Sequence, residues 1–575
     1  MMKKILILCL FTFQFITVFA NWIEFSDNYQ KELFEHLSNG IEQTEVKFSL
    51  DGYDIESVNV NGKNFQRISY PNQGEFIEVG KPDLPRFSRL VAIPDQGEAT
   101  FEIVSMEEEI VSNINVFPRQ IYQNESQPGN NKFVIDEEYY QTGEIFPLQV
   151  VELGTPAILR DYRIVSVTIN PFQYNPQTKE LRIIKSVDVS VSTSGSEREN
   201  PKARDGKISR FFEPLYESVI LNYESIKNRD GEYQQPCYVF IYADDDLLSL
   251  TGGYNLQDLI DWKRQKGFEV HAVCTDDIGS SNTLIKNYIQ DAYDDWDNPP
   301  EFVCLVGDPS SSYNLPCYYY SYGPSDHHYS LMEGNDDLAD IIVGRLSVDT
   351  GNDMKVIANK ILNYEKEPYL GETEWYMDNL LIGDVTTYSG PSTKSTCKFI
   401  KETMLDYNEN YTFNEYYSSS AGSFFQNSLN SGVSYFAYRG YLGMSGIPSY
   451  INNLSNGYMM PFVSCITCGT GGFDSESISE QFLEYGSATL PKAAIAAVGT
   501  ATMGTKTCYN NIVTAGIFHG IFHDNIFTAG GSLVRGKLAL FNSYSNSLGE
   551  NTAQSFFYWN NLMGDPGLEL WTGIP

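Results

Sequence analysis

The pattern of apolar and polar residues divides the chain into two parts with different expected folds. Over residues 21–193, apolar and polar residues largely alternate in several segments, such as 75–79 (EFIEV), 101–104 (FEIV) and 181–191 (LRIIKSVDVSV). Such alternation is typical of strands with one buried face, and Pro and Gly residues separate the segments. The pattern predicts an all-β domain over 21–193, either a sandwich or a barrel.

From residue 237 onward, near-continuous apolar runs alternate with stretches of helical periodicity. The clearest runs are 238–242, 302–306, 341–344, 380–382, 435–438, 462–466 and 493–498. Runs of this kind are typical of parallel strands whose sheet is covered by helices on both faces. We predict an α/β unit in two parts, 237–370 and 371–575, with its chemistry at the carboxyl ends of the strands.

The first twenty residues have the pattern of a secretory signal peptide. Lys3 and Lys4 precede an apolar run over 5–18, and small residues at Val18 and Ala20 suit a cleavage site after residue 20. No later run reaches about 18 uninterrupted apolar residues, the length that a membrane-spanning helix needs. We therefore expect a protein that is exported, secreted or held at the cell surface, and that does not span a membrane.

The region 194–236 is expected to link the two parts of the chain. Its first residues, 194–210 (SGSERENPKARDGKISR), are polar, rich in Lys and Arg, and without periodicity. Exposed segments of this composition are common sites of proteolytic cleavage. Both a plain domain boundary and an activation site fit the pattern.

The net charge and the positions of the cysteines exclude some classes of partner and of fold. The formal net charge of −35 argues against a nucleic-acid partner, because phosphates would be repelled. The acidic residues are spread along the chain, which fits a solvated surface as well as calcium ligands. Eight of the nine cysteines follow residue 236, and several lie in apolar runs, so we expect no dense disulfide scaffold.

The strongest chemical motif is 461–474 (PFVSCITCGTGGFD). A predicted strand ends at Cys468, and three glycines follow within four residues. A thiolate at a strand end can act as a nucleophile, and amides of a glycine loop, such as that of Gly469, can stabilise an oxyanion. Two alternatives are an inert buried thiol and a Cys465–Cys468 dithiol or metal site. Residues three apart in a strand face opposite sides, which disfavours shared chelation.

Several motifs, in the same order, resemble the gingipain family of cysteine peptidases. They are TCGTGGFD around Cys468, the acidic segment 325–348, GTATMGTKTCYNN at 499–511, GDPGLELW at 564–571 and GKPDLPRFSRLVAIP at 80–94. The last motif resembles the prodomain of that family. The resemblance implies a caspase-like catalytic domain, protein or peptide substrates, and the chain's own propeptide as a partner.

The histidine that serves as general base in the family has no counterpart at the corresponding position of this chain. In the family, that histidine lies in a Gly-His-Gly stretch before the cysteine, and the corresponding stretch, 440–443, has Tyr441 in that place. A neutral tyrosine, with a pKa near 10, accepts protons poorly at pH 7. His328, or its neighbour His327, is the candidate for a substitute base. Asp340 corresponds to the family's carboxylate that orients the base.

Other polar residues allow a metal site. Asp326, Asp336 and Asp337 are candidate ligands for a structural Ca²⁺, which members of the family bind. His519 and His523 would share one helix face, but no Glu completes an H-E-x-x-H zinc motif, so we interpret them as structural.

Two functions follow from these features, with one variant. The first is a secreted cysteine endopeptidase made as a zymogen, whose β-rich domain covers the cleft until cleavage. The second is a binding or surface protein that kept the fold after losing its base, which Tyr441 favours and the intact cysteine loop opposes. A transpeptidase-like or signal-processing enzyme would use the same nucleophile with a different acceptor.

Overall fold

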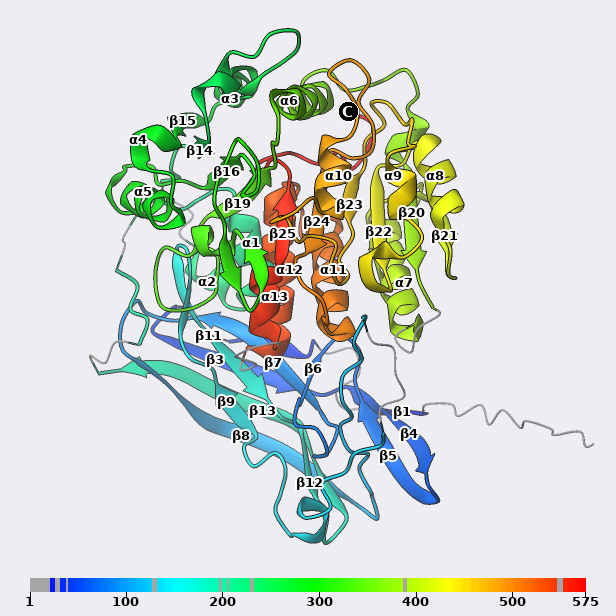
Figure 1. Ribbon diagram of the computed structural model, residues 1–575. Helices are drawn as coiled ribbons and strands as arrows, with labels where there is room; N and C mark the ends of the chain where they lie inside the picture. The colour runs from blue at the N-terminus through cyan, green and yellow to red at the C-terminus, as the bar shows by residue number, and fades with distance from the viewer. Residues whose placement is uncertain are drawn as a thin grey trace, which may run out of the picture.

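The computed structural model describes residues 21–25, 32–37, 40–126, 132–195, 199–203, 206–227, 232–385, 390–545 and 552–575. The predicted signal peptide therefore lies outside the described residues. The molecule has a β-rich N-terminal part beneath a larger α/β part, as Figure 1 shows. Within the described ranges, no helix is long and apolar enough to cross a bilayer.

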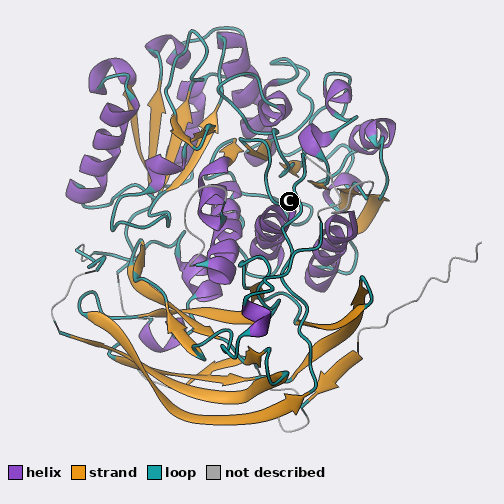
Figure 2. Cartoon of the chain, turned by 60° about the horizontal axis from the view of Figure 1, so that its bottom comes forward, coloured by secondary structure: helices purple, strands orange, loops and turns teal. Residues whose placement is uncertain are grey.

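The N-terminal part consists of three antiparallel sheets that curve beneath the helices (Figure 2). The first contains β1 (Asn21–Glu24), β4 (Gly52–Val60) and β5 (Lys63–Ser69). The second contains β6 (Gly74–Glu75), β7 (Pro85–Ala92), β9 (Val151–Leu153), β10 (Ala157–Leu159) and β11 (Tyr162–Ile169). The third contains β2 (Phe34–His36), β3 (Gln43–Ser49), β8 (Glu98–Ser112), β12 (Phe172–Asn175) and β13 (Glu180–Ser194). Alternating residues such as Val187, Val189 and Val191 fill its core, as their period predicts.

The region between β13 and the α/β part is more ordered than a simple polar linker. Two short helices, α1 (Glu213–Val219) and α2 (Tyr223–Ile226), lie within it. Phe212, Leu215 and Tyr216 are buried in the main core of the chain. Exposed residues lie before α1, such as Lys207 and Arg210, and also after it, such as Glu224 and Glu232.

One ten-stranded sheet forms the centre of the α/β part, in the order β15-β14-β16-β19-β25-β24-β23-β22-β20-β21. Its strands are β14 (Cys237–Tyr242), β15 (Glu269–Cys274), β16 (Phe302–Val306), β19 (Ile342–Leu346), β20 (Asp378–Gly383), β21 (Thr412–Tyr416), β22 (Tyr435–Arg439), β23 (Phe462–Ser464), β24 (Ala496–Thr500) and β25 (Asn560–Met563). A separate hairpin contains β17 (Tyr318–Tyr320) and β18 (Gly323–Ser325).

The helices connect the strands and cover the sheet. They are α3 (Leu256–Gln265), α4 (Thr275–Ile278), α5 (Asn282–Asp295), α6 (Gly351–Glu365), α7 (Gly390–Tyr407), α8 (Gly422–Asn430), α9 (Pro448–Ile451), α10 (Ile478–Glu484), α11 (Thr507–Phe522), α12 (Ala529–Tyr544) and α13 (Ala553–Trp559). Helices α11, α12 and α13 lie on the side that faces the β-rich part (Figure 1). This architecture confirms the predicted fold class of a caspase-like α/β domain preceded by a β-rich region.

The direction of the strands reverses in the middle of the sheet. Strand β25 is parallel to β19 but antiparallel to β24, while the strands within each half are parallel to one another. The carboxyl ends of the two halves therefore lie at opposite edges. The two predicted parts form one continuous sheet, because β25 pairs with β19 on one side and with β24 on the other. Without β25, each of these two strands would be an open edge.

Candidate active site

Three neighbouring strands of the second half end beside the candidate nucleophile. Cys468 follows β23, while Arg439 ends β22 and Thr505 follows β24, on either side of it. Parallel strands place their carboxyl ends at one edge, so these loops are expected to meet. The amide of Gly443 donates to the carbonyl oxygen of Cys468 at 2.8 Å, which joins the loop after β22 to the cysteine loop.

The Cys468 thiol is fully buried and hydrogen-bonded. Its Sγ lies 2.9 Å from Oγ1 of Thr505 and accepts from the amide of Thr505 at 3.2 Å. Burial raises the pKa of the thiol, and the nearby carboxylate of Glu125 raises it further. The thiol is therefore held in its protonated form in this state of the protein.

The other cysteine of the C-x-x-C pair belongs to a different environment. The Sγ of Cys465 donates to the carbonyl oxygen of Val498 at 3.3 Å, and the residue is part of a separate apolar cluster. All eight cysteines within the described ranges are free thiols. This arrangement offers no support for a Cys465–Cys468 dithiol.

A segment of the β-rich part lies along the cysteine site as an added strand. The amide of Glu125 donates to the carbonyl oxygen of Thr505 at 3.2 Å, and the amide of Thr507 donates to that of Gln123 at 3.0 Å. These bonds form an antiparallel bridge between Asn124 and Lys506. Strand addition of this kind is a common mode of peptide recognition.

The side chain of Glu125 occupies a fully buried pocket beside the nucleophile. Its carboxylate forms an ion pair with Arg439, whose side chain is also fully buried. It further accepts from Nδ2 of Asn510 at 2.8 Å and Oγ1 of Thr467 at 2.9 Å, and from the amide of Cys468 at 3.3 Å. Glu125 thus contacts the residues that surround the thiol.

Glu125, Thr505 and Asn510 contact the thiol site although no sequence pattern marks them as site residues. Glu125 is 343 positions from Cys468 in the chain, so no local pattern connects them. Thr505 and Asn510 lie within the motif 499–511. That motif supported the family resemblance by its place along the chain, but no role was assigned to its individual residues.

Tyr441 directly follows the loop glycine after β22 and is half-buried. Its carbonyl oxygen accepts from the hydroxyl of Tyr438 at 3.2 Å. None of the six histidines, all within the described ranges, forms a hydrogen bond or ion pair with Cys468. A histidine base is therefore absent from the contacts of the thiol in the described part of the chain.

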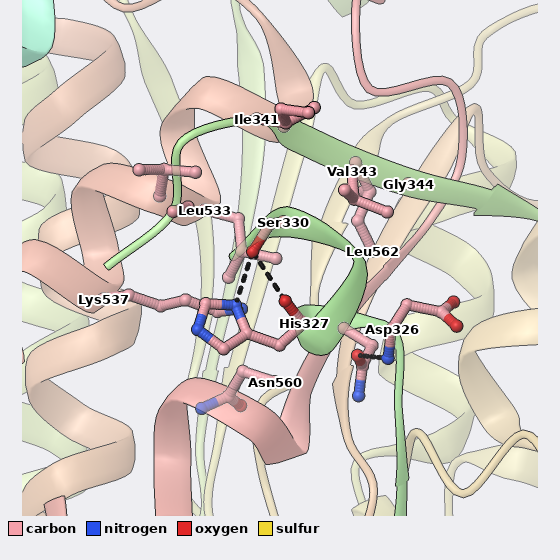
Figure 3. Close-up of a pocket in the computed structure, with 14 residues that line it drawn as sticks. Asp326, His327, Ser330, Ile341, Val343, Gly344, Leu533, Lys537, Asn560 and Leu562 are labelled. Carbon is pink, nitrogen blue, oxygen red and sulfur yellow. Dashed lines mark hydrogen bonds between the residues drawn. The ribbon is translucent and has the colours of Figure 1, made fainter. Parts of the chain in front are cut away.

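His327 lines a small cavity, and His328 is the next residue of the same short helix after β18. The ring of His328 stacks on Tyr318 with centroids 4.6 Å apart, and burial lowers its pKa to about 4. Nδ1 of His327 lies 3.2 Å from Nζ of Lys537 and 3.2 Å from Oγ of Ser330 (Figure 3). The role of His328 as a substitute base stays a prediction, and these contacts give it no support.

The carboxylate of Asp340 binds amides of the preceding loop and of the β-rich part. Its carboxylate accepts from the amides of Met332, Glu333 and Arg160 at 2.7, 2.9 and 3.1 Å. Asp340 precedes β19, which β25 and β24 separate from β23, a span of about 14 Å at normal strand spacing. Its assignment as the orienting carboxylate thus stays a prediction without a supporting contact.

Gly469 adopts a positive φ of 72°, and its amide donates to the carbonyl oxygen of Thr502 at 2.9 Å. That amide is therefore engaged within the loop in this state. Its role as an oxyanion donor stays a prediction, whereas the amide of Cys468 already binds a carboxylate oxygen of Glu125.

The three candidate calcium ligands each have donors from the protein. Asp326 binds the guanidinium of Arg345 through both oxygens at 2.7 Å. Asp336 accepts from the amide of Ile158 at 2.8 Å, and Asp337 accepts from Nε2 of Gln554 at 2.8 Å. A calcium site at these residues stays a prediction.

Within the described ranges, one cluster has the geometry to hold a metal, and it contains His519, His523 and Asp524. Nε of Arg535 donates to Asp524 at 2.7 Å, so a cationic group already neutralises this carboxylate. The cluster therefore fits the structural interpretation of the two histidines.

The fold and the site together define a class of protein. The site is a buried thiol at a strand end of the α/β sheet, covered by a strand from the N-terminal β-rich region. Residues 232–571 match peptidase family C25, and residues 33–230 match the C25 propeptide. The chain belongs to peptidase family C25, which confirms the resemblance found from the motifs.

Known relatives agree with this assignment. Gingipain R1 of Porphyromonas gingivalis is 26% identical over 469 residues, which are 79% of this chain and 46% of the relative. The crystal structure of the Arg-specific cysteine proteinase gingipain R has a TM-score of 0.53 at 21% identity, over 60% of this chain and 79% of that one. The complex of the pro- and mature domains of P. gingivalis RgpB has a TM-score of 0.52 at 19% identity, over 59% and 81%.

Proposed function

We propose that this chain is the precursor of an exported cysteine endopeptidase whose own propeptide keeps it latent. The observation that carries the proposal is the strand 123–125, which lies against the loop after β24 and closes over Cys468. A peptide substrate would need the same hydrogen-bonding groups of Thr505 and Thr507. The propeptide and a substrate therefore exclude each other.

The chemistry follows from the thiol. After the propeptide leaves, Sγ of Cys468 attacks the carbonyl carbon of the substrate and forms a thioester. The C–N bond breaks, and the proton from the thiol leaves with the amine product. Water then hydrolyses the thioester and regenerates the thiol.

A second candidate is a binding protein that has lost its catalysis. It is favoured by Tyr441 at the position of the base. The two functions differ in the state of the thiol once the propeptide is displaced. A peptidase needs a thiolate at neutral pH, and a binding protein does not.

The test uses the full chain with Glu125→Ala, cut by limited proteolysis between β13 and α1. Iodoacetamide labelling of Cys468 is followed from pH 5 to 10 by peptide mass spectrometry, beside hydrolysis of a denatured protein. We expect labelling with an apparent pKa below the ~8.5 of a free thiol, and hydrolysis that Cys468→Ala abolishes and Cys465→Ala retains. Labelling like an ordinary thiol, without hydrolysis, would establish the binding protein instead.

A further inference from the structure

The hydrogen bonds of the covering strand define its position as that of a bound substrate. Glu125 donates its amide to Thr505, and the residue two places before it, Gln123, accepts from Thr507. In an extended strand, these alternate residues point their side chains to the same side. The residue whose side chain enters the pocket next to the nucleophile is Glu125, so it lies where the residue before the scissile bond would lie.

The pocket that receives Glu125 is built for a negative charge. Apart from the carboxylate of Glu125, the hydrogen-bond partners of the Arg439 guanidinium in the described chain are all neutral oxygens. Its Nε donates to Oδ1 of Asn511 at 2.8 Å, and the other nitrogens reach the carbonyl oxygens of Ile466 and Thr507. In the covered state this cation is fully buried and paired with the carboxylate of Glu125. When the propeptide leaves, the guanidinium loses that partner, and a carboxylate from a substrate can replace it.

The remaining donors also suit a carboxylate. Nδ2 of Asn510 and Oγ1 of Thr467 both point to the same oxygen of Glu125, at 2.8 and 2.9 Å. A carboxylate has enough lone pairs for these two donors and for the guanidinium. A lysine or arginine side chain would instead bring a second cation against Arg439, and would offer no acceptor to these two donors, which would keep only their bonds to Gly440 and Thr505.

We propose that Arg439 is the specificity-determining residue of this peptidase, and that its primary pocket selects an acidic side chain, above all glutamate, before the scissile bond. This inference rests on the proposed function, since it names the substrate class of the same site. The propeptide then keeps the enzyme latent by presenting the side chain that the pocket selects.

The experiment distinguishes the reactivity of the Cys468 thiol from the selectivity of the pocket. The cut full chain carrying Glu125→Ala is treated with acyloxymethyl ketones of acetyl-Tyr-Gln-Asn-X, where X is Glu, Gln or Lys and the first three residues copy 122–124. Labelling of Cys468 is read by mass spectrometry, and iodoacetamide serves as a reagent that needs no pocket. We expect the Glu reagent to react about tenfold or more faster than the Gln reagent, because a charge-assisted hydrogen bond is lost with Gln. The Lys reagent should be slower still.

Two pocket variants extend the test. Arg439→Gln should bring the Glu and Gln rates together. Asn510→Asp places a carboxylate in the pocket without removing Arg439, and should lower the ratio of the Glu rate to the Lys rate. Having two variants covers the case in which the loss of a buried arginine prevents folding.

Each outcome decides the question. Rapid iodoacetamide labelling together with a Lys rate equal to or above the Glu rate would overturn the acidic pocket and leave the peptidase intact. A Glu preference that survives both variants would overturn the role of Arg439. Slow labelling by every reagent would overturn the proposed function, and the substrate class with it.

Discussion

Replacing Glu125 by glutamine in the intact precursor tests the latency contact with almost no change of shape. Glutamine has the size of glutamate and can still accept a hydrogen bond from Asn510. What the substitution removes is the negative charge that faces Arg439 in a site where both side chains are fully buried. The strand 123–125 keeps its backbone bonds to Thr505 and Thr507.

The magnitude follows from the burial of the pair. Removing one partner of a buried ion pair costs about 3–5 kcal/mol, because the remaining charge stays desolvated and unpaired. Each 1.4 kcal/mol is a factor of about ten in an equilibrium constant. The population in which the strand is detached from Cys468 should therefore increase by about 100-fold or more.

The assay is the rate at which iodoacetamide labels Cys468 in the uncut precursor, since the reagent reaches the thiol only when the strand opens. Loss of Glu125 also lowers the pKa of the thiol, because that carboxylate is the second cause of its rise after burial. Measurements over pH separate the two effects. The pKa effect disappears once the thiol is ionised in both proteins, and the effect of opening persists.

A control from the same β-rich part completes the design. Glu56 pairs with Arg67 at 3.1 Å, with both side chains about one-third exposed at 32% and 39%. Glu56→Gln should change the labelling rate little, because exposed pairs contribute at most about 1 kcal/mol. If Glu125→Gln accelerates labelling no more than Glu56→Gln does, Glu125 does not hold the precursor latent.

Three further predictions concern other parts of the α/β unit. Burial lowers the pKa of Lys537 to about 7, whereas an unfolded lysine titrates near ~10.4, so the unfolded chain binds more protons between these values and stability rises with pH. Lys537→Met should remove part of this rise, as measured by urea unfolding at pH 7 and pH 9.5, and an unchanged slope would contradict the burial argument. Asp326→Asn should cost about 3–5 kcal/mol by leaving Arg345 unpaired. An equal loss with calcium and with EGTA would show that Asp326 serves the ion pair and no metal. Tyr441→His in the cut chain that also carries Glu125→Ala should accelerate labelling of Cys468 with a new inflection near pH ~6.5, and an unchanged pH profile would remove Tyr441 from the position of the base.

The sequence predicted the parts of the fold that depend on local pattern. The apolar runs at 238–242 and 302–306 became β14 and β16, because continuous burial on both faces requires apolar residues at successive positions. The reversal at β25 was not predictable in this way. The run that forms β25 contains Asn560 and Asn561, and its partners β19 and β24 are distant in the chain.

Only the part of the site that lies in one continuous segment of the sequence was predictable. Cys468 and its glycine loop lie in one continuous motif, so their chemistry could be inferred from the sequence. Asp340 and His328 were chosen because they lie in the acidic segment 325–348 that resembles the family, but the contacts of a side chain depend on the order of the strands. Asp340 lies at the same edge of the sheet as Cys468 because β19 and β23 run in opposite directions, yet two strands separate them.

Two of the polar contacts that hold the propeptide lie far apart on the sheet, which bears on how latency ends. Glu125 binds in the second half of the sheet, while the amides of Arg160 and Ile158 bind Asp340 and Asp336 beside the first half. Cutting the linker between β13 and α1 breaks neither anchor. While one anchor holds, the other rebinds at an effective concentration on the order of millimolar. Linker cleavage alone should therefore leave the site covered, and full activation requires a second cut within the propeptide or the loss of one anchor.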